Sequence, residues 1–514
     1  MTSIVVRAFT LLISIGLMTI GSGSLTAQSD SNWSETRFYT GCAPGPFHPP
    51  LPPEHLETHY PPLGTQPSAA ALSVDLGNRT PDAESSRPIL GTGFNLEHGL
   101  WSCPEFRGVF RPQLLDPFKP AIARIDTGLL PAAPADMPAD NLGPPVYQSV
   151  LDSAPYAESW AFFRRLNRAG VKIVLGVWGG PGQFTDDGTR RGTLLPEHYD
   201  DYVEYVATVV NYLVERQNIQ VWACTIANEP DGGDGNEIPP SGLAYIAHQL
   251  AVRLGAMGVK LYGPDTANGA DALQYLPPLL DDPTVSDALA FVAFHQYYQS
   301  SEVGSVADYV HSRRADLPVV VTEYTSFNFG DLDDGQEANA QTGFALDIAA
   351  TLLSHYRQGA DAALYWDAVD YLQPGHDAVT KWGLLEGPAK DFAPRTRYYG
   401  LLQILPYLQP GARVLTDRSS GDDQVISLAI RTADGIPTIF MVNQDFIPVD
   451  LTLELNGQDA ATYPSMSVTR TSRQHTADHI GRVSLADGVG QLSLPPRSIT
   501  TLYPVGAGPQ PDDN

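Results

Sequence analysis

Eight short apolar runs that alternate with amphipathic stretches constrain the fold of this chain more than any other feature. The runs are Gly91–Leu96, Ala121–Asp126, Val171–Val177, Val221–Ala227, Val259–Gly263, Leu289–His295, Pro318–Tyr324 and Ala362–Asp367. Continuous apolar runs of this length, rich in Val, Ile and Ala, are typical of parallel strands that are buried on both faces. Between them, apolar residues recur at helical spacing, as in Tyr199, Val203 and Val206. Eight strand and helix alternations predict an α/β fold, a (β/α)₈ TIM barrel, rather than a shorter doubly wound sheet.

The sequence pattern changes after Pro410-Gly411 to short stretches that are typical of β-strands and are separated by turns. Ala433-Asp434-Gly435 is a hairpin turn signal, and the spacing of the runs favours a C-terminal antiparallel β-sandwich. The earlier stretch Ala71–Gly77 can add a strand to it. We therefore expect the barrel at residues 85–409, the sandwich at 410–506 and a tail at 507–514.

The N-terminal region has the pattern of a secretory signal peptide. Arg7 precedes a largely apolar run from Ala8 to Ile20, and small and polar residues then lead to Ala27. The apolar run is short for a bilayer span and is interrupted by polar and small residues, which favours export over a membrane anchor. We expect a signal peptide at residues 1–27, a proline-rich extended segment at 28–84, and a secreted protein, extracellular or periplasmic, with no membrane contact after cleavage.

Charge and cysteine content narrow the functional classes. The formal net charge of −27 disfavours nucleic acid and anionic lipid as partners, so a neutral ligand fits better. Cys42 and Cys103 could pair in an oxidising compartment, whereas Cys224 lies in an apolar run. No common metal motif is present, and the acidic stretch Asp231–Glu237 favours a solvated loop over an ion site. We expect neither a metal nor another cofactor; the sequence makes no prediction of the oligomeric state.

The polar residues that end the apolar runs are the candidates for chemistry, because a (β/α)₈ barrel carries its active site at the carboxyl ends of its strands. The fourth run leads into Asn228-Glu229-Pro230, and the seventh ends in Thr322-Glu323-Tyr324. Two carboxylates from these strands would face each other across the barrel mouth. Such a pair supplies a proton donor and a nucleophile or stabilising anion, which is what cleavage of a glycosidic bond needs.

On these residues the chain resembles clan A of the glycoside hydrolases, the (β/α)₈ retaining enzymes, and it most resembles glycoside hydrolase family 30. Asn228-Glu229-Pro230 matches the Asn-Glu-Pro of the clan, and Glu323 in VVVTEYT matches its second glutamate. The resemblance implies that Glu229 is the general acid/base and that Glu323 is the nucleophile. It also implies that Asn228 hydrogen-bonds the 2-hydroxyl group of the sugar.

The resemblance extends to other strand ends. His295 and Tyr297 match the His-x-Tyr of the sixth strand, and Arg124 lies where the family carries an arginine that helps to keep the nucleophile ionised. Trp178 and Trp366 end the third and eighth runs, where aromatic faces commonly stack on sugar rings, although both can also be packing residues. The third strand reads GVWGGPGQF and departs from the usual Trp-Ser-x-Pro-Pro pattern of the family.

These features predict a secreted retaining β-glycoside hydrolase that acts on a β-linked oligosaccharide or polysaccharide of the xylan, β-1,6-glucan or galactan type. Three alternatives stay open. They are an exo-β-glycosidase or glucosylceramidase-like enzyme, a relation to family 5 or family 39 of the same clan, and a carbohydrate-binding relative without catalysis. The sugar, the linkage and the endo or exo mode depend on loop geometry, which the sequence does not specify.

Overall fold

The predicted barrel is confirmed in the computed structural model, which describes residues 63–77, 87–96, 103–126, 137–326, 338–371, 380–457 and 459–507. Eight parallel strands close into a barrel in chain order. They are β2 (Gly91–Leu96), β3 (Ile122–Asp126), β4 (Lys172–Gly176), β5 (Val221–Thr225), β6 (Lys260–Thr266), β7 (Leu289–His295), β8 (Val319–Tyr324) and β9 (Ala362–Tyr365). Each strand coincides with one of the eight predicted runs, but β6 continues beyond its run to Thr266.

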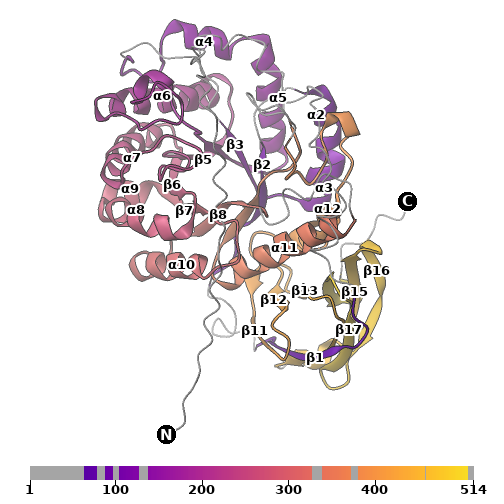
Figure 1. Ribbon diagram of the computed structural model, residues 1–514. Helices are drawn as coiled ribbons and strands as arrows, with labels where there is room; N and C mark the ends of the chain where they lie inside the picture. Colours follow the sequence, from indigo (N-terminus) through magenta and orange to yellow (C-terminus); the bar gives the residue numbers. More distant parts are fainter. Residues whose placement is uncertain are drawn as a thin grey trace, which may run out of the picture.

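Helices surround the barrel and connect successive strands (Figure 1). The α-helices are α2 (Pro104–Phe110), α3 (Asp116–Phe118), α4 (Pro145–Leu151), α5 (Ala154–Arg168), α6 (Tyr199–Asn211), α7 (Pro240–Gly255), α8 (Gly269–Asp281), α9 (Pro283–Ala288), α10 (Glu302–Arg313), α11 (Ala338–Arg357) and α12 (Thr396–Leu402). The shorter turns are η3 (Arg111–Leu115), η4 (Gly182–Phe184), η5 (Pro196–His198), η6 (Tyr212–Arg216), η7 (Pro388–Lys390) and η8 (Leu405–Tyr407). Gly170 and Gly359 follow α5 and α11 in the left-handed conformation, with φ of 81° and 102°, which ends a helix without a Cβ clash.

The interior of the barrel is a packed apolar core below the mouth. Its members include Ile122, Val174, Ala223, Phe291 and Val320, contributed by different strands. The outer faces of the same strands pack against the helices in a second, larger cluster. Burial on both faces explains why the strands are apolar throughout and why polar side chains occur mainly where the strands end.

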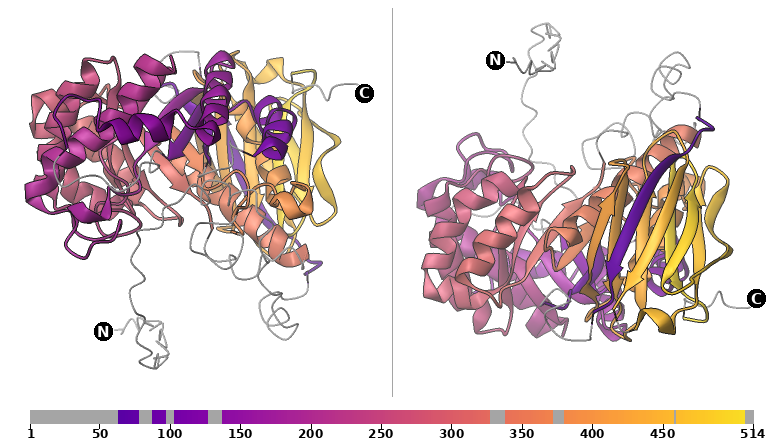
Figure 2. Two further views of the ribbon diagram at one scale, coloured as in Figure 1. Left: turned by 90° about the horizontal axis from the view of Figure 1, so that it is seen from above. Right: turned by 90° about the horizontal axis from the view of Figure 1, so that it is seen from below.

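The C-terminal strands form a sandwich of two sheets. One sheet has the order β11-β1-β14-β17 and the other has the order β10-β12-β13-β18-β15-β16. The strands are β1 (Ser68–Asp75), β10 (Arg413–Val414), β11 (Thr416–Ser420), β12 (Val425–Arg431), β13 (Pro437–Asn443), β14 (Val449–Asn456), β15 (Ser465–Ser472), β16 (His475–Ser484), β17 (Val489–Leu494) and β18 (Ser498–Pro504). The N-terminal strand β1 lies among these C-terminal strands (Figure 2), parallel to β14 and antiparallel to β11.

The sandwich packs on the barrel through the larger sheet. Phe440, Val442 and Ile499 of that sheet belong to the same apolar cluster as the barrel helices, including Phe344 and Ile348 of α11. Figure 1 shows α11 and α12 lying between the barrel strands and the sandwich. This contact covers the helices on one side of the barrel and leaves the strand ends at the mouth free of the sandwich.

Several sequence predictions fall on parts of the chain outside the described residues. These parts include the predicted signal peptide and all of the proline-rich segment before residue 63. Cys103 is disulfide-bonded, while its predicted partner Cys42 lies outside the described residues. Cys224 is a buried free cysteine in the barrel wall. No helix among the described residues is both long enough and apolar enough to span a bilayer.

Candidate active site

Arg124 is the centre of a buried polar network at the carboxyl ends of the barrel strands. It lies on β3 and is completely buried. Its Nη1 donates to Glu323 Oε1 and, at 2.9 Å, to Asn95 Oδ1. Its Nη2 donates to Asn228 Oδ1 at 2.6 Å and to Asp265 Oδ2 at 2.8 Å. Burial opposes the charge, but the carboxylates and Tyr262 around it raise the pKa of Arg124, so the guanidinium stays protonated.

Glu323 ends β8 with both carboxylate oxygens occupied. Oε1 accepts from Arg124, and Oε2 accepts the hydroxyl of Tyr297. The side chain is 3% exposed. The backbone of Glu323 is also held by the chain that follows β7, because Gln296 N–H donates to Glu323 O at 3.0 Å. Donors on both oxygens fix the rotamer and favour the ionised form.

Glu229 lies in the loop after β5, on a strained backbone. Its φ of 41° is in the left-handed region, which is uncommon for a residue with a Cβ. The loop that follows turns back onto the carboxylate, and Asp234 N–H donates to Glu229 Oε2. Asn228 is held from the same loop, because its Nδ2 donates to Asp234 O at 2.9 Å. The loop Asp231–Glu237 is therefore a support for the site rather than the simply solvated loop that its composition favours.

His295 connects the two glutamates. Its Nδ1 lies 2.7 Å from Glu229 Oε1, and its Nε2 lies 3.4 Å from Glu323 Oε1. The imidazole is fully buried at the end of β7. One carboxylate oxygen of Glu229 and one of Glu323 are within 4.8 Å of each other. The carboxylates predicted to face each other across the mouth are thus brought together by the fold.

The electrostatics of this trio differ from the simple expectation for an acid and a nucleophile. Burial raises the pKa of Glu323 to about 7, although His295 and Arg124 oppose the shift. Burial acts in the same direction on Glu229, but the hydrogen bond and charge of His295 outweigh it and lower the pKa of Glu229. The pKa of His295 is raised against its burial by the carboxylates on either side. In the free site the pKa of Glu323 therefore lies above that of Glu229, which is the reverse of the order that a nucleophile and a proton donor need.

Trp178 and Trp366 lie together at the mouth, with ring centroids 5.9 Å apart. Trp178 is half-buried, and the Arg124 guanidinium lies 4.1 Å from the centre of one of its rings. That face is therefore used for a cation–π contact within the protein. Trp366 is 8% exposed. The pair is placed as the sequence predicted, but only part of its aromatic surface remains for a ligand.

Two further buried residues belong to the network: Asp265, which was not identified from the sequence, and Asn95, which lies at the end of the first predicted run. Asp265 is in β6, beyond the end of the predicted run, and it accepts hydrogen bonds from Arg124 and from Thr322 Oγ1. Asn95, in β2, links Arg124 to the backbone carbonyl of Thr322. A carboxylate two residues after an apolar run was the available signal for Asp265, because it obeys the same rule that identified Glu229.

The trio of Glu229, His295 and Glu323 also offers three potential metal-ligand atoms within 4.8 Å of one another. The buried guanidinium of Arg124 contacts Glu323, and its charge would repel a cation at this position. The donor set is therefore better suited to sharing a proton than to holding a metal ion. The expectation that the protein needs no metal or cofactor stays a prediction.

Part of the chain matches a known family. Residues 200–357 match the family model of the glycosyl hydrolase catalytic core. The matched segment contains Asn228, Glu229, His295, Tyr297 and Glu323. No match was found among curated protein sequences.

Solved structures with the same architecture include a GH30 endoxylanase from Clostridium papyrosolvens C71, with 18% identity and a TM-score of 0.63 over 84% of this chain and 99% of that chain. An endo-β-1,6-glucanase has 15% identity and a TM-score of 0.58, covering 84% and 94%. A conserved exported protein from Bacteroides fragilis has 12% identity and a TM-score of 0.59, covering 84% and 100%. At these identities the similarity shows the fold, which is the barrel and sandwich predicted from the sequence.

Proposed function

We propose that this glycoside hydrolase, which has the fold of family 30 enzymes, cleaves β-linked polysaccharide with retention of configuration. In this proposal Glu229 is the general acid/base and Glu323 is the nucleophile. The observation that carries it is the separation of at most 4.8 Å between a carboxylate oxygen of Glu229 and one of Glu323. Retaining enzymes hold their carboxyl groups about 5–5.5 Å apart, whereas inverting enzymes need about 6.5–9.5 Å to admit a water molecule.

The surroundings of each glutamate support the division of roles. Glu323 attacks the anomeric carbon, and Arg124 and Tyr297 hold both of its oxygens in place. Glu229 donates a proton to the leaving oxygen as the glycosidic bond breaks, which leaves a covalent glycosyl-enzyme. Glu229 then removes a proton from water, and the resulting attack on the anomeric carbon releases the sugar and restores Glu323.

Glu229 must gain a proton before the first step, because His295 lowers its pKa in the free site. His295 touches both carboxylates, so it can carry out this transfer. The raised pKa of His295 favours the imidazolium, which has hydrogen on both ring nitrogens, and its Nδ1 proton can pass to Glu229. The products are a protonated Glu229 and a neutral imidazole with hydrogen on Nε2, beside an ionised Glu323, so charge and protons balance.

Asn228 is suited to bind the sugar 2-hydroxyl group. Its Oδ1 is occupied by Arg124, and one hydrogen of its Nδ2 is used by Asp234 O. The amide nitrogen has a second hydrogen, and a hydroxyl group at the site can accept it. Such a contact strengthens as positive charge develops on the sugar ring in the transition state.

The substrate class and the location of the enzyme are parts of the same proposal. An endoxylanase and an endo-β-1,6-glucanase share the fold, which supports testing xylan and β-1,6-linked glucan and galactan first. An exo-β-glycosidase mode is the main alternative. The N-terminal signal-peptide pattern supports secretion, and a protein described as exported has the same architecture.

Variants of the two glutamates test the roles. Glu323→Ala should abolish turnover of a β-linked polysaccharide, and azide should restore cleavage of an activated aryl glycoside with inverted product. Glu229→Ala should retain far more activity on aryl glycosides with very good leaving groups than on polysaccharide, because such leaving groups need no proton. Glu215→Ala changes an exposed glutamate of η6, is the matched control and should behave as wild type.

Product analysis completes the test. Long and intermediate oligosaccharides at early times indicate endo cleavage, whereas single sugars or disaccharides indicate an exo enzyme. Wild-type turnover by the Glu323→Ala variant would refute the assignment of the nucleophile. An absence of turnover by the wild-type protein on all β-glycans of the panel would favour a carbohydrate-binding relative.

A further inference from the structure

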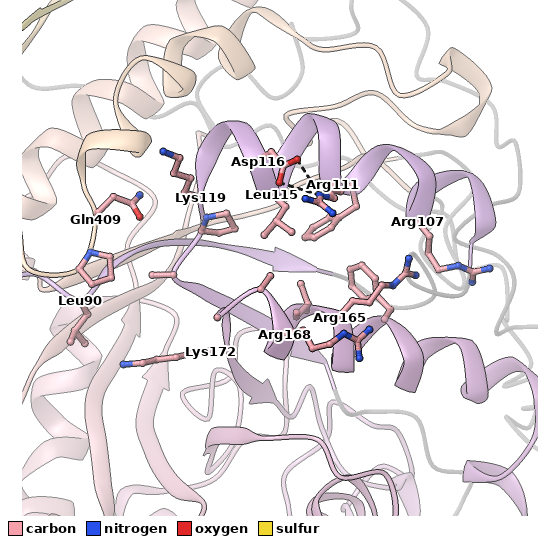
Figure 3. A pocket seen from close by; sticks show the side chains of 18 residues that line it. Leu90, Arg107, Arg111, Leu115, Asp116, Lys119, Arg165, Arg168, Lys172 and Gln409 are labelled. Atoms are coloured by element: carbon pink, nitrogen blue, oxygen red, sulfur yellow. Dashed lines mark hydrogen bonds and ion pairs between the residues drawn. The ribbon is translucent and has the colours of Figure 1, made fainter. Parts of the chain in front are cut away.

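A second pocket lies at the opposite end of the barrel from the glutamates. Its volume is about 850 Å³. It lies between the helices that follow β2 and β3, and its wall includes Leu90, Ala121 and Lys172, which are at or just before the amino ends of β2, β3 and β4. Figure 3 shows the pocket between these helices. Because the proposed catalytic residues lie at the carboxyl ends of the strands, this pocket is a separate site.

The pocket is lined mainly by cationic residues, although the protein as a whole is strongly acidic. The chain has 31 Lys and Arg residues against 58 Asp and Glu residues. In the pocket, the only acidic lining residue among those described is Asp116, and the cationic ones are Arg107, Arg111, Lys119, Arg165, Arg168 and Lys172. These side chains come from separate segments of the chain and extend around the pocket in Figure 3. The fold therefore collects positive charge at one place on a strongly negative protein.

Most of this positive charge is not neutralised by the protein. Arg111 pairs with Asp116 at 3.2 Å. Within the described part of the chain, no acidic side chain lies within ion-pair distance of Lys119, Arg165, Arg168 or Lys172. Arg165 lies over the ring of Phe162 at 5.9 Å, and Lys172 lies over the ring of Trp222 at 4.3 Å. Exposed cations without counter-charges are available for an anionic ligand.

Apart from Gln409, the rest of the lining is apolar. Phe110 and Phe162 contribute aromatic surface, and Leu115, Leu166 and Pro410 contribute aliphatic surface. A ligand that matches this pocket has anionic groups at its edges and apolar C–H faces between them. Carboxylated sugars have this character, because a uronate ring has C–H faces that pack on apolar side chains and a carboxylate that guanidinium groups bind.

We propose that this pocket binds an acidic oligosaccharide, a short stretch of glycan that carries uronate carboxylates. The volume suits a ligand of a few sugar units. A long phosphate polymer is disfavoured, because the formal net charge of −27 repels a polyanion that extends beyond the pocket. The choice of a glycan over other small polyanions rests on the proposed function. The pocket would anchor the enzyme to acidic regions of a polysaccharide while the barrel mouth acts on β-linked bonds.

Binding of tetragalacturonate, measured by calorimetry at low salt, tests this site. Its α-linkages make it a ligand that a β-glycosidase does not cleave, so binding is measured without turnover. The variant Arg165→Glu/Arg168→Glu reverses two unpaired charges of the pocket. The matched control, Arg473→Glu/Arg482→Glu, makes the same charge change at exposed positions on the sandwich. We expect about tenfold weaker binding or more for the pocket variant and less than about twofold for the control.

Three further arms identify the ligand chemistry. The methyl ester of tetragalacturonate should bind at least about tenfold more weakly than the acid, because esterification removes the carboxylate charges. Inorganic phosphate and short single-stranded DNA should bind more weakly than tetragalacturonate. Equal binding of acid and ester, equal binding by both double variants, or tighter binding of DNA would each overturn the proposal.

Activity separates this site from the proposed catalytic one. The pocket variant should cleave a neutral aryl β-glycoside at the wild-type rate, which also shows that it is folded. If the pocket variant loses that activity because it does not fold, the comparison of tetragalacturonate with its methyl ester on the wild-type protein decides: weaker binding of the ester supports the proposal and equal binding overturns it. If the wild-type protein binds tetragalacturonate but cleaves no β-glycan, the proposed function fails and the pocket stands.

Discussion

The guanidinium of Arg124 and the carboxylate of Glu323 form a buried ion pair at the floor of the barrel mouth. The same guanidinium donates to Asn228 and to Asp265, so one side chain orients groups from three other strands or strand ends. Arginine can do this because its planar group carries five donors in a fixed geometry. The proposed nucleophile and the proposed sugar-binding amide are consequently held in register by a single residue.

The pH dependence of kcat/KM should reflect the two glutamates as a pair that works with one proton. That proton is lost as pH rises through the raised pKa values of His295 and Glu323, the latter about 7, so activity should fall above about pH 7. The second proton is gained only below the lowered pKa of Glu229, so the acid limb should lie below the ordinary range of a glutamate. A pH profile with a neutral aryl glycoside measures both limbs. Activity that still rises between pH 7 and about pH 9 would contradict this assignment.

Replacement of Arg124 should move this profile. The charge of Arg124 lowers the pKa of both Glu323 and Glu229, so Arg124→Gln should shift both limbs of kcat/KM to higher pH. The rate should fall by about 10²-fold, because Glu323 loses its anchor. The variant leaves Asp265 buried without its partner, which should lower the free energy of unfolding by about 3–5 kcal/mol.

Two further variants separate charge from geometry. Arg124→Lys keeps the charge but cannot make all the hydrogen bonds of the guanidinium, so the limbs should stay near wild type while the rate falls. Arg397→Gln removes another fully buried guanidinium, at the start of α12, and should leave both limbs in place. If both limbs of the kcat/KM pH profile stay at their wild-type positions in Arg124→Gln, Arg124 does not control the protonation of Glu229 and Glu323.

The strands of the barrel could be predicted because a strand that is buried on both faces consists of a continuous run of apolar residues. The predicted fold is confirmed by the closed barrel and the sandwich, and the predicted enzyme class by the match of residues 200–357 to the glycosyl hydrolase catalytic core. Strand β16 was not predicted, because most of its residues are exposed and polar and it contains no apolar run. It forms because it pairs with β15, which is a tertiary contact that the residues of β16 do not encode locally.

The site was predictable to the extent that its residues end strands. Glu229 and Glu323 follow that rule, whereas Asp265 was missed because β6 continues through Gly263 and Pro264 to Thr266. The backbone contact between Asp234 and Glu229 was also unpredictable. It depends on how a glycine-rich loop turns back, and composition alone favours solvation of such a loop.

Gly233→Ala should reduce activity with little effect on stability. A methyl group at this position would overlap the Oε2 of Glu229. The carboxylate can move away at little cost in folding free energy, but a displaced proton donor misses the leaving oxygen. We expect a fall in kcat on polysaccharide of about 10²-fold. The loss should be smaller on aryl glycosides that need no proton.

Gly255→Ala is the matched control, because a methyl group there meets open space at the end of α7. It should have wild-type activity, and thermal unfolding should place both variants within a few degrees of the wild type. Equal kcat on polysaccharide for Gly233→Ala and wild type would mean that the loop does not set the position of Glu229.

His355→Leu should stabilise the protein, and more so at acid pH. His355 is fully buried in α11 beside the ring of Tyr324, and neither ring nitrogen has a hydrogen-bond partner among the described residues. Burial lowers its pKa from 6.5 to about 3. Between these values the unfolded chain binds a proton that the folded protein does not, so the wild type loses free energy of unfolding as pH falls from about 6.5 towards 3.

The leucine variant lacks this titratable group. The excess of its free energy of unfolding over that of the wild type should therefore grow by up to about 1.4 kcal/mol for each unit by which the pH is lowered in this interval. At neutral pH the advantage should be about 1–3 kcal/mol, from removal of the unpaired ring nitrogens. Urea unfolding of the paired variants at several pH values measures both terms, with His479→Leu on the exposed strand β16 as the control. A difference between His355→Leu and wild type that stays constant with pH would mean that His355 gains its proton in the folded protein as readily as in the unfolded chain.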